Sequence, residues 1–154
     1  MRKLRFWVEA AIIAAMYAVL TIINPWSSGE IQVRISEALT VLPYFTPAAV
    51  PGLFIGCLTA NIFVGTGIYD IVFGSLTTLA AAFASYKIKN KLLVPLPPVV
   101  LNAVVVAYVL KFTLGAPLLA TMGFVALGQF IACYGLGYPL LLYLEKNSET
   151  IFKR

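Results

Sequence analysis

Residues 33–42 read VRISEALTVL and place a guanidinium, Arg34, and a carboxylate, Glu37, at the edge of a long apolar region. An ionisable side chain at membrane depth is costly unless it is paired or faces a cavity. The whole chain has six acidic residues and no histidine, so the position of Glu37 is informative. The segment indicates a helical membrane protein whose interior can hold a polar ligand.

The composition excludes an ordinary soluble domain. Of the 154 residues, 61% are hydrophobic and 11% are charged, and the mean hydropathy is +0.94. Soluble domains carry about 25% charged residues. The length predicts a single domain, residues 1–154. We interpret the net charge of +5 as flanking charge of membrane spans, and expect the lipid bilayer, not nucleic acid, as the surrounding partner.

Hydropathy predicts six membrane-spanning helices, because a spanning helix needs about 20 apolar residues. The expected ranges are 6–23, 35–45, 47–64, 70–86, 92–112 (starting at Leu92 or Pro95) and 118–144. Proline is tolerated in the first turn of a helix but not in its interior. The second and third helices are therefore separated at Pro43, Pro47 and Pro51. Two glycines and a proline near residue 137 predict a bend in the last helix.

Basic residues predict that both termini are cytoplasmic. They cluster within residues 2–5, 87–91 and 146–154. Excess lysine and arginine mark cytoplasmic loops, and six spans place all three clusters on one side, whereas five or seven do not. The N-terminal cluster resembles that of a signal peptide, but the apolar run after it is long enough to span, so we expect a retained helix. The prediction is an all-α, multi-pass protein of the cell membrane.

A small set of polar side chains interrupts the apolar helices. In the expected topology, Glu37, Asn61 and Asp70 lie toward the outer side, while Asn102 and Gln129 interrupt the fifth and sixth helices. A pore needs polar residues along its full depth, whereas a pocket open to the outside needs them in the outer half. The candidate substrate-binding residues are Glu37, Arg34, Asn61, Asp70, Tyr69, Asn102, Gln129 and Tyr134.

Each candidate also has a purely structural interpretation. Arg34 can pair with Glu37 at the start of the second helix. Asp70 can cap the fourth helix and interact with its dipole. Asn102 and Gln129 can bond to one another between helices. The candidate tyrosines can be anchors at the membrane interface.

The sequence shows no pattern for a metal or a cofactor. Cys57 and Cys133 lie in separate apolar segments, so we expect two buried apolar residues. A phosphate-binding glycine loop with lysine is also absent, so we expect that the chain cannot hydrolyse ATP. The alternative from another class is an intramembrane enzyme that uses Glu37 and Asp70, which would need a nucleophile or a metal set. A channel or a structural membrane protein is a further alternative.

Small residues repeat every four positions on two of the expected helices. In lipid, such stripes let helix backbones approach closely. On the first helix we expect a docking surface for another membrane subunit, with internal packing as the alternative; the residues are Ala10, Ala11, Ala14, Ala15 and Ala18. On the third helix, Gly52, Gly56 and Ala60 form a similar row, for which we expect internal packing.

Four segments resemble the QueT family: residues 33–43 (VRISEALTVLP), 46–57 (TPAAVPGLFIGC), 69–76 (YDIVFGSL) and 133–137 (CYGLG). The similarity covers essentially the whole chain. Members are substrate-binding S components of energy-coupling factor (ECF) transporters, assigned to queuosine precursors. The resemblance implies a six-helix fold, a 7-deazaguanine ligand such as preQ1 or queuine, and a T component and two ATPase subunits as partners. An S component for another vitamin or purine-like base is the alternative within this class.

The implied ligand suits the candidate residues. Glu37 can accept the N1–H and the exocyclic amine of a guanine-like edge in parallel, which is strong and directional. Asn61, Asn102 and Gln129 can complete the remaining hydrogen bonds, and a tyrosine or phenylalanine ring can stack on the flat bicycle. If the ligand is preQ1, Asp70 is the candidate partner of its aminomethyl ammonium.

Overall fold

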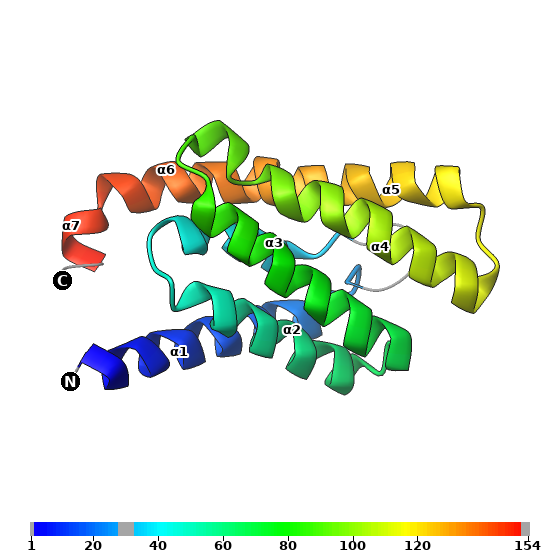
Figure 1. The fold of residues 1–154 in the computed structure, drawn as a ribbon, viewed down its shortest axis with the longest axis horizontal. Coiled ribbons are helices and arrows are strands. Elements are labelled where there is room, and N and C mark those ends of the chain that lie inside the picture. The colour runs from blue at the N-terminus through cyan, green and yellow to red at the C-terminus, as the bar shows by residue number, and fades with distance from the viewer. Residues whose placement is uncertain (1, 28–32, 152–154) are drawn as a thin grey trace.

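Nearly all of the chain is helical in the computed structural model, which describes residues 2–27 and 33–151 (Figure 1). None of these residues lies in a β-strand. The α-helices are α1 (Arg2–Ile23), α2 (Ala49–Val64), α3 (Ser75–Lys87), α4 (Leu96–Leu114), α5 (Leu118–Phe130), α6 (Tyr138–Lys146) and α7 (Ser148–Ile151). Two 3₁₀-helices, η1 (Ile35–Tyr44) and η3 (Lys91–Leu93), and two π-helices, η2 (Asp70–Gly74) and η4 (Ile131–Gly137), complete the described elements.

The prediction of an all-α membrane protein is confirmed. Three stretches are long and apolar enough to cross a membrane, Arg2–Ile23, Lys91–Leu114 and Leu118–Lys146, and Ala49–Val64 is a shorter apolar helix. Large apolar side chains are exposed on most of the helices, among them Phe63, Phe112 and Leu119. Such surfaces are expected where lipid, not water, surrounds a protein. The chain is therefore a multi-pass membrane protein.

The second expected helix is a buried 3₁₀-helix. Its ten residues rise only about 20 Å, because a 3₁₀-helix rises about 2.0 Å per residue, and the hydrocarbon core of a bilayer is about 30 Å thick. Every residue from Ser36 to Pro43 is buried. The hydroxyl of Thr40 donates to the carbonyl of Glu37 at 2.6 Å, which reinforces the tight turn. The segment thus forms part of the bundle interior.

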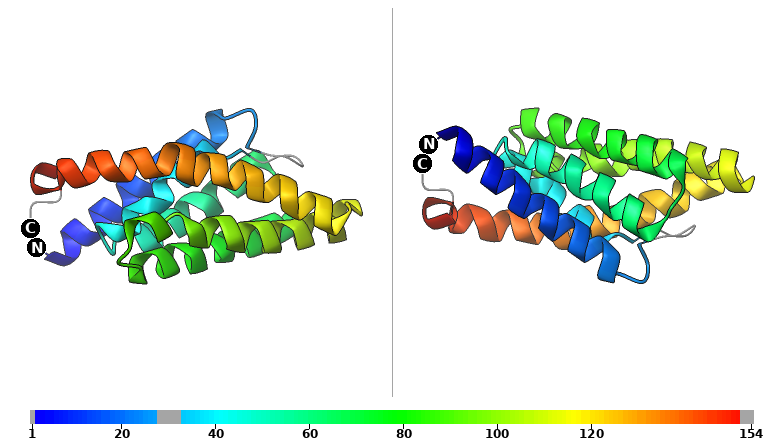
Figure 2. Two further views of the ribbon diagram at one scale, coloured as in Figure 1. Left: turned by 90° about the horizontal axis from the view of Figure 1, so that it is seen from above. Right: turned by 90° about the horizontal axis from the view of Figure 1, so that it is seen from below.

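The last expected helix is interrupted where the glycines predicted a bend. The π-helix η4 joins α5 to α6 and contains Gly135 and Gly137, and Figure 2 shows the three elements as one curved run. Gly137 also permits close contact with η1, because a Cβ atom there would lie 3.2 Å from the carbonyl oxygen of Ala38. A π-helical segment is a recognised cause of helix bending and is frequent at functional sites.

Both termini lie at the same end of the bundle (Figure 1). The turns between α2 and α3 and between α4 and α5 lie at the opposite end (Figures 1 and 2). Each turn follows a helix that ends in a left-handed glycine, Gly65 with φ 72° and Gly115 with φ 67°. Glycine adopts this conformation without a steric penalty. Asn61 and Asp70 flank the first of these turns.

Helices α1 and α2 pack closely against each other. A Cβ atom on Gly52 would lie 2.8 Å from the carbonyl oxygen of Ala10, and one on Gly56 would lie 2.8 Å from that of Ala14. Only glycine allows this approach, so the internal packing predicted for Gly52 and Gly56 is confirmed. Ala60 is fully buried as well.

This contact corrects the prediction for the alanine stripe on α1. Ala10, Ala14 and Ala18 are buried, and the first two face the glycines of α2. Side chains that are buried against α2 cannot also form a docking surface. Ala11 and Ala15 are exposed on α1, so the docking prediction is retained for these two residues alone.

We expect Gly56→Ala to destabilise the protein, because the added methyl group would overlap backbone atoms of α1. Overpacking of this kind costs about 1–3 kcal/mol. The matched control is Gly123→Ala on α5, where a Cβ atom would meet nothing within 4 Å. Thermal unfolding in detergent should show that Gly56→Ala lowers the melting temperature of the protein. Gly123→Ala should not lower it. Equal melting temperatures would contradict the close contact.

Candidate functional site

A polar interior lies within the apolar bundle. Buried polar side chains come from α1, η1, α2, η2, α3, α4 and α5, and hydrogen bonds connect many of them across these elements. Polar groups in such surroundings are costly unless they are hydrogen-bonded. The atoms that remain without partners therefore indicate where a ligand is expected to bind.

Glu37 lies at the centre of this interior and is only 1% exposed. The hydroxyl of Tyr17 donates to its Oε1 atom at 2.5 Å. Its Oε2 atom is buried and has no hydrogen-bond partner among the residues that the structure describes. One oxygen of the carboxylate is thus fixed by the protein, and the other is available to a donor from outside.

Helix α1 holds the segment that carries this carboxylate. Tyr17 and Thr21 lie one turn apart on its buried face, and the hydroxyl of Thr21 bonds to that of Ser36 at 2.7 Å. Tyr17 was absent from the predicted site. The signal was present in the sequence, because Tyr17 and Thr21 are the only polar side chains between residues 10 and 23 and are four residues apart.

Arg34 is buried, but it does not neutralise Glu37 directly. Its Nε atom donates to the carbonyl of Ser27 at 3.1 Å. Within residues 2–27 and 33–151 it forms no ion pair with Glu37. The pairing considered from the sequence is therefore not formed as a salt bridge.

Asn61 connects α2 to the start of η2. Its Nδ2 atom donates to the carbonyl of Asp70 at 3.1 Å and lies 3.6 Å from the Sγ atom of Cys57. Its Oδ1 atom is buried without a partner in the described part of the chain. The side chain is therefore oriented by its amide nitrogen, and its carbonyl oxygen is left as a second free acceptor.

The Asp70 carboxylate caps no helix in the part of the chain that the structure describes. Asp70 is 9% exposed, and none of the hydrogen bonds or ion pairs between described residues involves its side chain. The capping interpretation is thus not observed, and the carboxylate is free to accept a donor.

Ser75 adds a third unpartnered group that the predicted site did not include. It is 1% exposed, and its hydroxyl has no partner among the described residues. A Cβ atom on the preceding Gly74, the last residue of η2, would lie 3.4 Å from the Nδ2 atom of Asn61, so the junction of η2 and α3 lies close to α2. A serine within an apolar helix ordinarily bonds to the backbone of that helix. The sequence therefore did not mark Ser75 as a candidate site residue.

Asn102 and Gln129 bond to each other, as the structural interpretation proposed. The Nδ2 atom of Asn102 donates to the Oε1 atom of Gln129 at 3.2 Å, which joins α4 to α5. The thiol of Cys133 lies 3.7 Å from that same oxygen and 3.7 Å from the carbonyl of Glu37. Cys57 and Cys133 are both buried, as predicted, and both contact polar groups.

Tyr69 and Tyr134 point away from this interior. Tyr69 is 55% exposed and stacks on Phe73 at 6.5 Å, in an apolar cavity of about 540 Å³ between η2 and α4. The hydroxyl of Tyr134 donates to the carbonyl of Leu92 at 2.8 Å, and its ring stacks on Phe130. The structure therefore does not bring either ring to the free acceptors.

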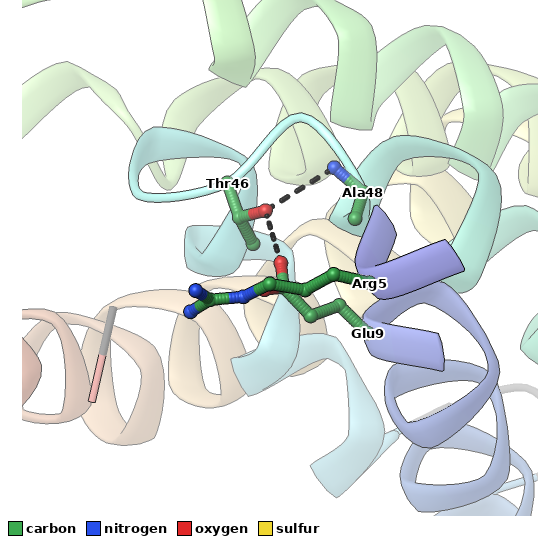
Figure 3. A network of polar contacts seen from close by, with 4 residues as sticks. All are labelled: Arg5, Glu9, Thr46 and Ala48. Carbon is green, nitrogen blue, oxygen red and sulfur yellow. Dashed lines mark hydrogen bonds and ion pairs between the residues drawn. The ribbon is translucent and has the colours of Figure 1, made fainter. Parts of the chain in front are cut away.

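A separate polar network ties the connection between η1 and α2 to α1 (Figure 3). Glu9 pairs with Arg5 at 2.9 Å and accepts a hydrogen bond from the hydroxyl of Thr46 at 3.0 Å. Thr46 in turn accepts from the backbone N–H of Ala48 at 3.3 Å. This network lies on the N-terminal part of α1 and fixes the end of η1 that is farther from Glu37.

Together, the fold and the buried polar side chains define a multi-pass helical membrane protein with a polar interior between its helices. No group of three or more metal-ligating side chains occurs in the described residues. Residues 7–146 match the sequence profile of the QueT transporter, and the chain belongs to this family. It is therefore a transporter protein, and the alternative of an intramembrane enzyme is wrong.

A relative from Lactococcus lactis has the same family name. The chain is 28% identical over 144 residues to the "Queuosine precursor transporter QueT" of Lactococcus lactis subsp. cremoris (strain MG1363), covering 82% of this chain and 85% of that protein. No solved structure matches the chain.

Proposed function

We propose that this protein is the S component of an ECF importer and captures a 7-deazaguanine queuosine precursor, preQ1 or a close relative. Its family and the name of its Lactococcus relative support a transporter for a queuosine precursor. The ligand binds in the polar interior, with Glu37 and Asn61 as its principal contacts. We also propose that the chain makes six passes, with η1 as a short pass enclosed by the other helices, and that both termini are cytoplasmic. The common position of the termini supports this topology (Figure 1).

The observation that carries the proposal is the set of unpartnered atoms in the interior: Glu37 Oε2, Asn61 Oδ1 and the hydroxyl of Ser75. The first two can only accept hydrogen bonds, and the hydroxyl can accept or donate. A 7-deazaguanine offers two adjacent donors, N1–H and the exocyclic amine, with the O6 acceptor beside them. Bound there, it satisfies buried groups that are otherwise costly.

The structure changes the expected geometry at Glu37. Because Tyr17 already donates to Oε1, the carboxylate offers its free Oε2 to one ligand donor in this proposal, and Asn61 Oδ1 accepts from the other. Asp70, whose carboxylate is free, pairs with the aminomethyl ammonium of preQ1. Asn102 and Gln129 support the wall of the pocket through their mutual hydrogen bond.

Transport energy comes from partner subunits in this proposal. The sequence contains no phosphate-binding loop, so two ATPase subunits and a T component supply it. The exposed alanines of α1, Ala11 and Ala15, form the surface that docks on the T component, since small side chains permit close helix contact in lipid.

Glu37→Gln should weaken preQ1 binding by about 1.5–3 kcal/mol, the range of a hydrogen bond to a charged group, while the protein stays folded. Isothermal calorimetry on the purified protein measures the affinity. The control is Glu145→Gln, which alters an exposed ion pair with Lys91 and should change nothing. Unchanged affinity in Glu37→Gln would show that Glu37 is not a ligand contact. If the native protein bound none of preQ1, preQ0 and queuine, the proposed ligand would be wrong.

Asp70→Asn should weaken preQ1 far more than preQ0, whose nitrile carries no charge. The expected difference is on the order of 1–3 kcal/mol for the loss of a charge-assisted hydrogen bond. Calorimetry with both ligands on the same preparation provides the comparison, and preQ0 is the internal control. If both ligands weaken equally, Asp70 contacts the base edge or supports the pocket, and its role as the ammonium partner is disproved.

Ala15→Trp should abolish uptake of labelled preQ1 in cells and leave binding to the isolated protein intact. The added ring would keep a partner helix from approaching α1. Leu119→Trp is the control, because Leu119 is 84% exposed on α5, away from the proposed docking surface, and it should preserve uptake. Full uptake by Ala15→Trp would exclude this face as the docking surface.

A further inference from the structure

The geometry points to Tyr17 as a positioning residue that sets the orientation of the Glu37 carboxylate for ligand binding. This inference rests on the proposed function, because it concerns how the same site is organised. It adds a residue from α1 to a site whose ligand contacts all come from η1, α2, η2 and α3.

Tyr17 is built into the interior and does not anchor the helix at the membrane surface. Its side chain is fully buried, and it ranks among the largest such side chains in the described chain. On α2, a Cβ atom at Gly56 would lie 2.8 Å from the Cβ atom of Tyr17, so the ring has little freedom to move. A hydroxyl on a fixed ring is a rigid donor.

The hydrogen bond from Tyr17 is the only one that the described residues make to the Glu37 carboxylate. Arg34, the ion-pair partner considered from the sequence, is bonded through Nε to a backbone carbonyl instead. A carboxylate side chain has several rotatable bonds and needs such an anchor to keep one orientation. With Oε1 held at 2.5 Å, Oε2 is presented to the ligand in a defined direction.

A neighbouring hydroxyl allows this role to be separated from the general packing of α1. Thr21 lies one turn further along the same face and bonds to Ser36, the residue before Glu37. It supports η1 as Tyr17 does, but it does not touch the carboxylate. The two hydroxyls therefore differ in the one contact on which the inference depends.

The test is a double-mutant cycle with Tyr17→Phe and Glu37→Ala, in which preQ1 binding is measured by equilibrium dialysis with labelled ligand. Tyr17→Phe keeps the ring and removes the hydroxyl. In the native background it should lower the affinity for preQ1 about tenfold, which is the effect of one hydrogen bond. In the Glu37→Ala background it should lower the affinity less than about twofold, because the carboxylate that it orients is absent. Thr21→Val should change affinity less than Tyr17→Phe in the native background. Thermal unfolding without ligand confirms that each variant is folded.

Each outcome has a distinct meaning. If Tyr17→Phe lowers affinity by the same factor in both backgrounds, Tyr17 only packs the bundle, and the positioning role is refuted. If Tyr17→Phe binds preQ1 as tightly as the native protein, the role is also refuted, although Glu37 can still be a ligand contact. If the native protein binds no preQ1 while remaining folded, the proposed function fails and this inference falls with it.

Discussion

Burying an ionisable carboxylate in a membrane bundle costs several kcal/mol unless donors surround it, and the structure is arranged around this constraint at Glu37. The carboxylate is carried on a short 3₁₀-helix that is buried along most of its length. One oxygen is satisfied by Tyr17 from α1 and the other is left without a partner. A site that is satisfied on one side only is suited to bind a molecule that supplies the missing donors.

The close packing of α1 on α2 makes this arrangement possible. Glycines on α2 bring the two backbones together, and the buried face of α1 then directs Tyr17 and Thr21 toward η1. The other face of α1 keeps Ala11 and Ala15 exposed. In the proposed function, α1 therefore supports the ligand site with one face and docks on a partner with the other. This explains why its sequence is rich in small residues yet contains two polar ones.

Much of the fold was predictable from the sequence. Apolar runs, prolines and glycines located each helical segment, because lipid requires backbone groups to be satisfied within helices. The 3₁₀ character of η1 and the π-helices η2 and η4 were not predicted, since they arise from packing between elements that are distant in the sequence. The contact between Gly137 and Ala38 is an example.

The candidate site was predictable only in part. Residue types at membrane depth pointed to Glu37, Asn61 and Asp70, which the structure places in or beside one polar interior. Tyr17 was missed although its spacing from Thr21 was a usable signal. Ser75 gave no such signal, because a serine in an apolar helix usually bonds to its own backbone. The sequence also does not reveal which face of a helix an aromatic ring occupies, and Tyr69 lies in an apolar cavity instead.

The most direct test of this account is an experimental structure of the protein with preQ1 bound. The account predicts that the N1–H and the exocyclic amine of preQ1 lie within about 2.7–3.2 Å of Glu37 Oε2 and Asn61 Oδ1, the ordinary range for such hydrogen bonds. The hydrogen bond from Tyr17 to Glu37 is retained in that structure. A ligand bound in the apolar cavity beside Tyr69 and Phe73, with both oxygens still unpartnered, would contradict it.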